Sequence, residues 1–141
     1  MIPARFHNHP DGFQFDRDER GRVRLNIGLV GRQALHAHQI SVAATAAEGI
    51  GLILDEVVLD AQIRRGWQEH LAGLDLFTVG VHCELAELER REKARGDRMI
   101  GQARRQFEHV HEEMRYDLEV DSGALTPAQV AKQILATRTD W

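Results

Sequence analysis

The chain has 141 residues, of which 43% are hydrophobic and 28% are charged. This composition is that of one ordinary globular domain, and it excludes the disordered, collagen-like and disulfide-rich classes of protein. The formal net charge is −4 and no long run of consecutive lysines and arginines occurs, so neither nucleic acid nor an anionic membrane is favoured as a partner.

The first predicted elements are a hairpin and a helix. Apolar residues alternate between Gly12 and Ile27, on both sides of a polar turn. This alternation predicts a β-hairpin. Apolar residues then recur at helical spacing between Gly31 and Glu48, and Gly49 stands where a helix usually ends. We therefore expect a helix over this second segment.

Two buried strands and a helix are predicted next. The segment from Ile50 to Val58 is a short apolar run that carries Asp55 and Glu56 toward its carboxyl end, which is typical of a parallel strand buried on both faces. Residues 60–71 predict a second helix. Residues 74–83 are rich in residues that favour strands, so a second buried strand is expected there.

The last third of the chain adds three helices and a strand. Helices are predicted from Glu84 to about Arg95, with Gly96 at the end, and from Ile100 to Met114. Residues 116–120 alternate as a half-buried strand, and Thr126 to Gln129 form a capping box that opens a final helix. Strands that alternate with helices indicate a single α/β domain over residues 1–141, with ligands beyond the carboxyl ends of a parallel sheet.

The cellular location follows from two further features. The single cysteine, Cys83, lies in an apolar run and has no partner for an internal disulfide, which fits a buried thiol in a reducing cytosol. The sequence has neither an apolar stretch of membrane-spanning length nor the hydrophobic region of a signal peptide. We therefore expect a cytoplasmic protein that does not enter the membrane.

The histidines do not predict a metal site. Three pairs are spaced two residues apart, namely His7/His9, His36/His38 and His109/His111. On a helix this spacing turns two side chains about 200° apart, so the last two pairs cannot chelate one ion. His38 and His111 each share a helix face with apolar neighbours. They are either partly buried helix residues or residues that line a pocket.

Acids and arginines supply the other candidate site residues. Asp55 and Glu56 follow the apolar run, where an α/β enzyme places acids that hold a metal or orient a hydroxyl; the alternative is a simple polar strand end. Arg91 and Arg95 lie one turn apart on the predicted helix, with Arg98 just beyond it. Such guanidinium groups suit phosphate oxygens, although interleaved glutamates also allow a solvated face of salt bridges.

A series of motifs in a fixed order resembles the chloramphenicol phosphotransferase-like family, and the resemblance covers nearly the whole chain. The motifs are Pro10 to Phe13 with Phe15-Asp16, Leu52 to Val57, Phe77 to Cys83, Glu89 to Arg98, Gly101 to Ala103, Val110-His111 and Tyr116 to Asp121. This resemblance implies a three-layer, parallel-sheet P-loop kinase-like domain. It also implies transfer of the ATP γ-phosphate, with Mg²⁺, to a hydroxyl of a small molecule, with the antibiotic chloramphenicol as the type substrate.

The resemblance also implies roles for the candidate residues. The run from Arg95 to Arg98 would match the arginine-bearing lid over the nucleotide, with Arg91 beside it. Asp55 and Glu56 would match acids near the reaction centre. His38, on the helix from Leu35 to Ala46, and His111 would line the acceptor pocket, so these two histidines and the two acids are the expected substrate-binding residues.

The chain departs from the family at one important point. It contains no Gly-x-x-x-x-Gly-Lys-Ser/Thr loop, so the family's first two strands, its lysine and its catalytic aspartate have no match. The resemblance places them before Met1, and no catalytic residue is assigned within the chain. Without that loop little phosphoryl transfer is expected.

Two readings of this departure stay open. We expect a truncated kinase, or one whose start is placed too late at Met1, and we expect its unpaired strands to promote self-association. The alternative is an inactive remnant that serves as a binding or interaction module.

Overall fold

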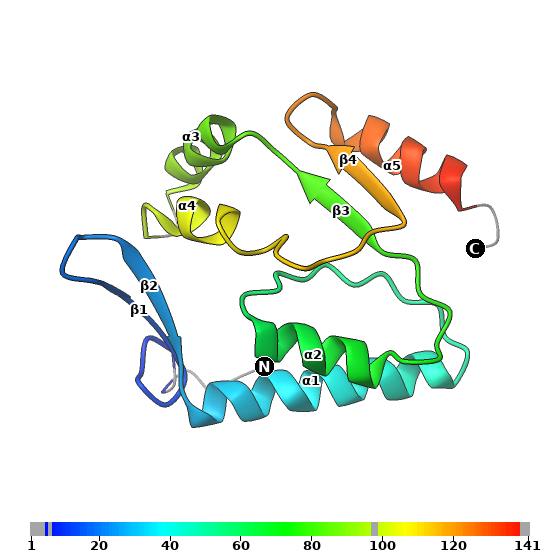
Figure 1. Ribbon diagram of the computed structural model, residues 1–141, viewed down its shortest axis with the longest axis horizontal. Helices are drawn as coiled ribbons and strands as arrows, with labels where there is room; N and C mark the ends of the chain where they lie inside the picture. Colours follow the sequence, from blue (N-terminus) through cyan, green and yellow to red (C-terminus); the bar gives the residue numbers. More distant parts are fainter. Residues whose placement is uncertain (1–4, 6, 97–98, 139–141) are drawn as a thin grey trace.

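A hairpin, a pair of helices and a small parallel sheet flanked by further helices form a mixed α/β structure (Figure 1). The computed structural model describes residues 5, 7–96 and 99–138. In chain order the elements are β1 (Phe13–Arg17), β2 (Val23–Ile27), α1 (Leu29–Ala47), α2 (Ala61–His70), β3 (Val79–His82), α3 (Leu85–Arg95), α4 (Gln102–Phe107), β4 (Leu118–Asp121) and α5 (Pro127–Thr137).

The structure contains the β-hairpin that the alternating apolar residues between Gly12 and Ile27 predict. β1 and β2 pair antiparallel, with Phe13 opposite Ile27 and Arg17 opposite Val23. The Arg17 guanidinium donates hydrogen bonds to the carbonyl of Gly21 in the turn at 2.7 Å and to that of Ile100 at 2.9 Å. The hairpin is thereby tied to the segment that precedes α4.

Helices α1 and α2 pack side by side (Figure 1). Their bounds are close to those predicted from the sequence. Asp60 caps the N-terminus of α2, because its carboxylate accepts hydrogen bonds from the backbone N–H groups of Gln62 and Ile63. Gln39 of α1 is only 4% exposed, and its side-chain amide donates to the carbonyl of Ile63 at 3.0 Å. This buried hydrogen bond fixes the distance between the two helices.

Strands β3 and β4 pair in parallel and form a second two-stranded sheet. Val79 lies opposite Leu118 and His82 opposite Asp121. Two predicted helix boundaries are confirmed nearby: Gly96 ends α3 with φ of 66°, and Thr126 with Gln129 forms the capping box of α5.

The strand predicted over residues 50–58 is not formed. These residues have no regular secondary structure, and most of their side chains are exposed, including Ile53 at 92%. A strand needs hydrogen-bonding neighbours, and none of the described residues pairs with this segment. The described strands therefore form two separate two-stranded sheets, and the single parallel sheet expected within a three-layer fold is absent from them.

Two further predicted spans are too long. The strand expected over residues 74–83 is limited to β3, which extends only as far as its partner β4. The helix expected from Ile100 to Met114 is limited to α4. Gly101 precedes α4 with φ of 106°, and Glu113 has φ of 53°; both angles interrupt helical geometry.

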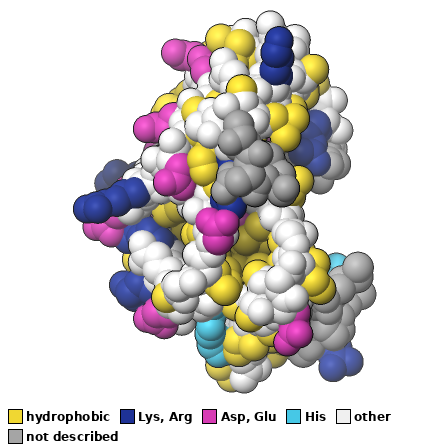
Figure 2. Space-filling model, turned by 90° about the vertical axis from the view of Figure 1, so that its right-hand side faces the viewer, with side chains coloured by type: hydrophobic (Ala, Val, Ile, Leu, Met, Phe, Trp, Pro, Cys, Tyr) yellow, Lys and Arg dark blue, Asp and Glu magenta, His cyan; other side chains and the backbone are white. Residues whose placement is uncertain are grey.

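The surface carries hydrophobic side chains in a hollow (Figure 2). Within the described residues, no helix is both long and apolar enough to cross a membrane.

Candidate functional site

The structure brings together two of the predicted substrate-binding residues, His38 and Glu56. His38 lies on α1, and Glu56 lies on the segment that returns from α1 to α2. His38 Nε2 and Glu56 Oε1 are 2.8 Å apart, with side chains 46% and 26% exposed. The imidazole also meets the ring of buried Trp67 edge to face, with centroids 5.6 Å apart. One side of the His38 ring is thus fixed while the pair stays open to solvent.

This arrangement suits proton transfer. In a neutral imidazole, a hydrogen bond from Nε2–H to the carboxylate leaves Nδ1 as the acceptor nitrogen of the ring. An imidazole oriented in this way can take a proton from a hydroxyl group. Asp55 is exposed in the same segment, and no hydrogen bond or ion pair within the described residues joins it to the pair.

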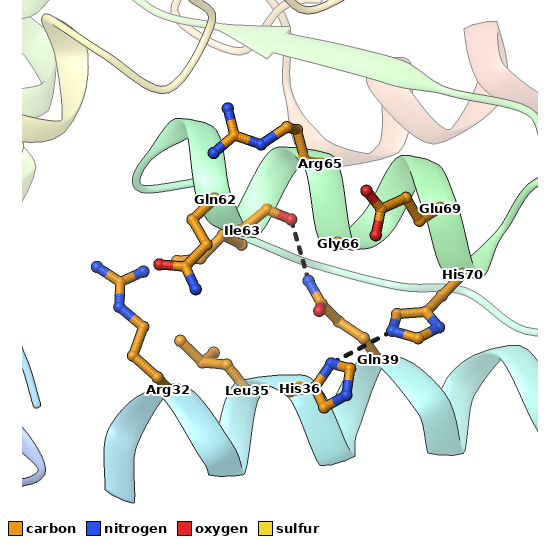
Figure 3. A pocket seen from close by; sticks show the side chains of 10 residues that line it. All are labelled: Arg32, Leu35, His36, Gln39, Gln62, Ile63, Arg65, Gly66, Glu69 and His70. Carbon is orange, nitrogen blue, oxygen red and sulfur yellow. Dashed lines mark hydrogen bonds between the residues drawn. The ribbon is translucent and has the colours of Figure 1, made fainter. Parts of the chain in front are cut away.

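A polar pocket of about 240 Å³ lies between α1 and α2 (Figure 3). It is lined by Arg32, Leu35, His36, Gln39, Gln62, Ile63, Arg65, Gly66, Glu69 and His70. His36 Nδ1 and His70 Nε2 lie 3.3 Å apart. Arg32 forms an ion pair with Asp60 at 2.7 Å. Burial opposes ionisation of Asp60, but the hydrogen bonds from Ile63 and Arg32 prevail and hold its pKa below the ordinary value of an aspartate.

The sequence does not reveal this pocket, because most of its lining residues come from α2 and meet α1 only in the folded chain. A signal was present on α1, where Arg32, Leu35, His36 and Gln39 recur at the spacing of one helix face. In the sequence, the spacing of His36 suggests only His38 as its partner. In the structure its neighbour is His70, which lies 34 positions away in the sequence.

His111 belongs to a second cluster, on β3 and β4. Its Nδ1 lies 2.7 Å from the Tyr116 hydroxyl, and its ring stacks on His82 with centroids 4.1 Å apart. His82 in turn pairs with Glu119 at 2.8 Å. Burial, and secondarily the nearby His82, lower the pKa of His111 from its ordinary value. Within the described residues no hydrogen bond, ion pair or ring contact joins this cluster to His38.

His82 and Glu119 were missed because their proximity depends on strand pairing. Gly80 and His82 share one face of β3, and Gly80 lies opposite Glu119 in the parallel register. A sequence that does not reveal this register cannot place the two side chains together.

The predicted phosphate-binding arginines are in different situations. Arg91 donates to Glu87 at 2.7 Å and to the carbonyl of Ser122 at 2.7 Å, so it ties α3 to the turn after β4. Arg95 is the last residue of α3 and is exposed. Arg98 lies outside the described residues.

The lysine and the aspartate that the resemblance implies have no counterpart at the described sites. They were expected before Met1, and Met1 itself lies outside the described residues. Their place therefore stays a prediction, and no side chain of the described part of the chain matches the family motif of either residue.

The solvated face predicted for α3 forms in part. Glu87 pairs with Arg90 and Arg91, and Glu89 pairs with Arg104. Glu92 departs from this pattern, because it is only 6% exposed. Its carboxylate accepts from the backbone N–H groups of Gly101 and Ala103 at 2.8 and 2.7 Å. It therefore holds the segment after residues 97–98 against α3.

Comparison with known proteins gives a family match over nearly the whole chain. The sequence profile described as chloramphenicol phosphotransferase-like protein matches residues 1–139. Two curated relatives, from the CDC 1551 and H37Rv strains of Mycobacterium tuberculosis, are provisionally named O-phosphotransferase. Each is 29% identical over 101 residues, which cover 72% of this chain and 45% of the relative. The match therefore spans less than half the length of these relatives.

Proposed function

Because the chain belongs to the chloramphenicol phosphotransferase-like family, we propose that it is the acceptor-binding part of an O-phosphotransferase acting on a hydroxyl of a small molecule. The phosphate donor is ATP with Mg²⁺, and chloramphenicol is the first acceptor to test. The observation that carries the proposal is the contact between His38 and Glu56 at 2.8 Å, within a chain that matches the family from residue 1 to residue 139.

The residues at hand do not make a complete nucleotide site. The sequence has no Gly-x-x-x-x-Gly-Lys-Ser/Thr loop, and the described residues hold no group of three or more histidine, cysteine or acidic side chains suited to a metal ion. Arg91 is already engaged by Glu87 and Ser122. We therefore assign no phosphate-binding loop among these 141 residues, and we assign Arg95 and Arg98 to the lid over the nucleotide.

The chain's own residues act on the acceptor. Glu56 orients His38, and the free Nδ1 of His38 takes the proton from the acceptor hydroxyl as its oxygen becomes the nucleophile. Trp67 fixes the other side of the ring. Asp55 lies exposed beside Glu56 and can bind polar groups of the acceptor, whereas His111 would contact the acceptor only if it extends to β3 and β4.

The test measures phosphorylated product. The natural gene product that carries this chain is incubated with Mg-ATP and a panel of hydroxylated small molecules that includes chloramphenicol, and products are identified by mass spectrometry. Replacing Glu56→Gln or His38→Gln should lower kcat by roughly 100-fold or more. Glu48→Gln, which alters an exposed carboxylate at the end of α1, should leave kcat unchanged.

The alternative function is binding without catalysis, which the missing phosphate loop favours. In that case a hydroxylated compound binds the natural gene product, and binding weakens on His38→Gln, but no compound is phosphorylated. Transfer that proceeds equally well in the Glu56→Gln and His38→Gln proteins would refute the assigned roles while leaving the family function intact.

A further inference from the structure

The pocket between α1 and α2 has fixed walls. Besides the buried hydrogen bond from Gln39 to Ile63, Gly66 permits close approach of the helices. A Cβ atom at Gly66 would lie 2.4 Å from Oε1 of Gln39, closer than packing allows. The volume of about 240 Å³ is smaller than that of a pocket for a drug-sized molecule. The pocket therefore suits a small metabolite or one end of a larger ligand.

Charges are distributed unevenly along the pocket (Figure 3). Arg32, Gln62 and Arg65 lie toward the end where α2 begins, and Glu69, His36 and His70 lie toward the end where α2 finishes. The first end presents guanidinium and amide donors, whereas the second presents a carboxylate. The pocket is thus polarised along the helix axes.

Several of these polar groups are available to a ligand. Within the described residues, the side chains of Gln62, Arg65 and Glu69 form no hydrogen bond or ion pair. Arg65 and Glu69 are four positions apart, a spacing at which side chains on a helix can meet, yet they do not pair with each other. Their backbone positions lie roughly 6 Å apart along the helix axis.

The balance of charge favours a dipolar ligand over a simple anion. Arg32 is neutralised by Asp60 at 2.7 Å, so the remaining formal charges are the positive charge of Arg65 and the negative charge of Glu69. A lone anion would gain from Arg65 but be repelled by Glu69, and a lone cation would meet the reverse. The hydrogen-bonded pair of His36 and His70 can present either a donor or an acceptor beside Glu69.

We propose that this pocket binds a small zwitterion, with its carboxylate at Arg65 and Gln62 and its ammonium group at Glu69. The two ligand charges should be separated by roughly one helical turn, about 6 Å. This site differs from the His38–Glu56 pair, and it does not depend on phosphoryl transfer.

The experiment uses the 141-residue chain and three probes that share a four-carbon chain. γ-Aminobutyrate carries both charges, butyrate carries only the anion and butylamine only the cation. Binding is followed at low ionic strength by isothermal titration calorimetry and by shifts of the backbone amide signals of α1 and α2. We expect γ-aminobutyrate to bind at least tenfold more tightly than either singly charged probe.

Variants separate the two ends of the site. Arg65→Gln should reduce γ-aminobutyrate affinity to that of butylamine, and Glu69→Gln should reduce it to that of butyrate. Gln68→Ala alters an exposed residue of the same helix that does not line the pocket, and it should leave binding unchanged. All three positions are exposed, so circular dichroism should show intact helices.

Three results would overturn the proposal. They are equal affinity for the three probes, γ-aminobutyrate binding that persists in both charge variants, and absence of any binding at millimolar concentration. None of these results bears on the phosphotransferase proposal, which is tested by product formation and by the His38 and Glu56 variants.

Discussion

At the scale of single residues, the cluster of His82, His111 and Tyr116 depends on close contacts that leave no space for a larger side chain. The ring of Tyr116 lies directly over Gly80, where a Cβ atom would be 2.6 Å from Tyr116 Cδ2. The same Tyr116 holds His111 through its hydroxyl at 2.7 Å. A glycine on β3 thus determines the position of a histidine that comes from the segment after α4.

Replacing Gly80→Ala should therefore destabilise the chain and disturb the histidine cluster. Overpacking of this kind costs about 1–3 kcal/mol, and unfolding in urea would measure the loss. The His111 ring signals in NMR spectra should shift as Tyr116 moves. Gly51→Ala is the matched control, because no atom lies within 4 Å of a Cβ there; its effect should stay below about 0.5 kcal/mol. Equal stability of the two variants would contradict the packing argument.

The same residue scale shows how far the site could be predicted. His38 and Glu56 were both identified from the sequence, because one lies on a helix with clear periodicity and the other ends an apolar run. His70, His82 and Glu119 were not identified, since each acquires its role only from a partner on another element. A side chain whose role follows from its local pattern can be predicted from the sequence. A pair that forms only when two elements pack together cannot.

At the scale of elements, α3 is held by a cluster of charges. Hydrogen bonds from Arg90 and Arg91 lower the pKa of Glu87 from 4.5 to about 2. Because the folded pKa lies below the unfolded value, this group stabilises the fold fully above pH 4.5, and the contribution is lost as the pH falls from 4.5 toward 2. Acid should therefore loosen α3 and its link through Arg91 to Ser122.

Replacing Glu87→Gln should remove this part of the acid sensitivity. The free energy of unfolding of the variant should lie below that of the wild type at pH 6, and the difference should shrink as the pH approaches 2. Glu84→Gln, at an exposed carboxylate just before α3, serves as the control and should not change the pH dependence. A difference between Glu87→Gln and the wild type that stays constant from pH 6 to 2 would contradict the assignment.

The elements predicted correctly are those specified by local signals. The hairpin follows from alternation, α1 from its apolar spacing, α3 from Gly96 and α5 from its capping box. The predictions over residues 50–58 and 74–78 were wrong, because an apolar run becomes a strand only when another strand pairs with it. That partner is not found in the described part of the chain.

At the scale of the whole molecule, apolar side chains remain open to solvent. Seven of them lie on the segment after α1 or on and near β3, namely Ile50, Leu52, Ile53, Leu54, Val57, Leu76 and Val81, and they are between 39% and 92% exposed. In the described residues, β3 also pairs with β4 alone, so its other edge offers unpaired backbone groups. Both features favour association with another polypeptide.

We therefore predict that the 141-residue chain self-associates in solution through this apolar surface. Ile53 is 92% exposed, and burying an isoleucine side chain contributes about 1.5–3 kcal/mol. Ile53→Lys should thus weaken the association constant by roughly 10- to 100-fold, measured by sedimentation velocity over a range of concentrations. Gln68→Lys introduces the same charge at another exposed position without removing an apolar side chain, and it should leave association unchanged. A chain that stays monomeric at every concentration and melts in one sharp transition would contradict this prediction, because its apolar segment would then need no partner.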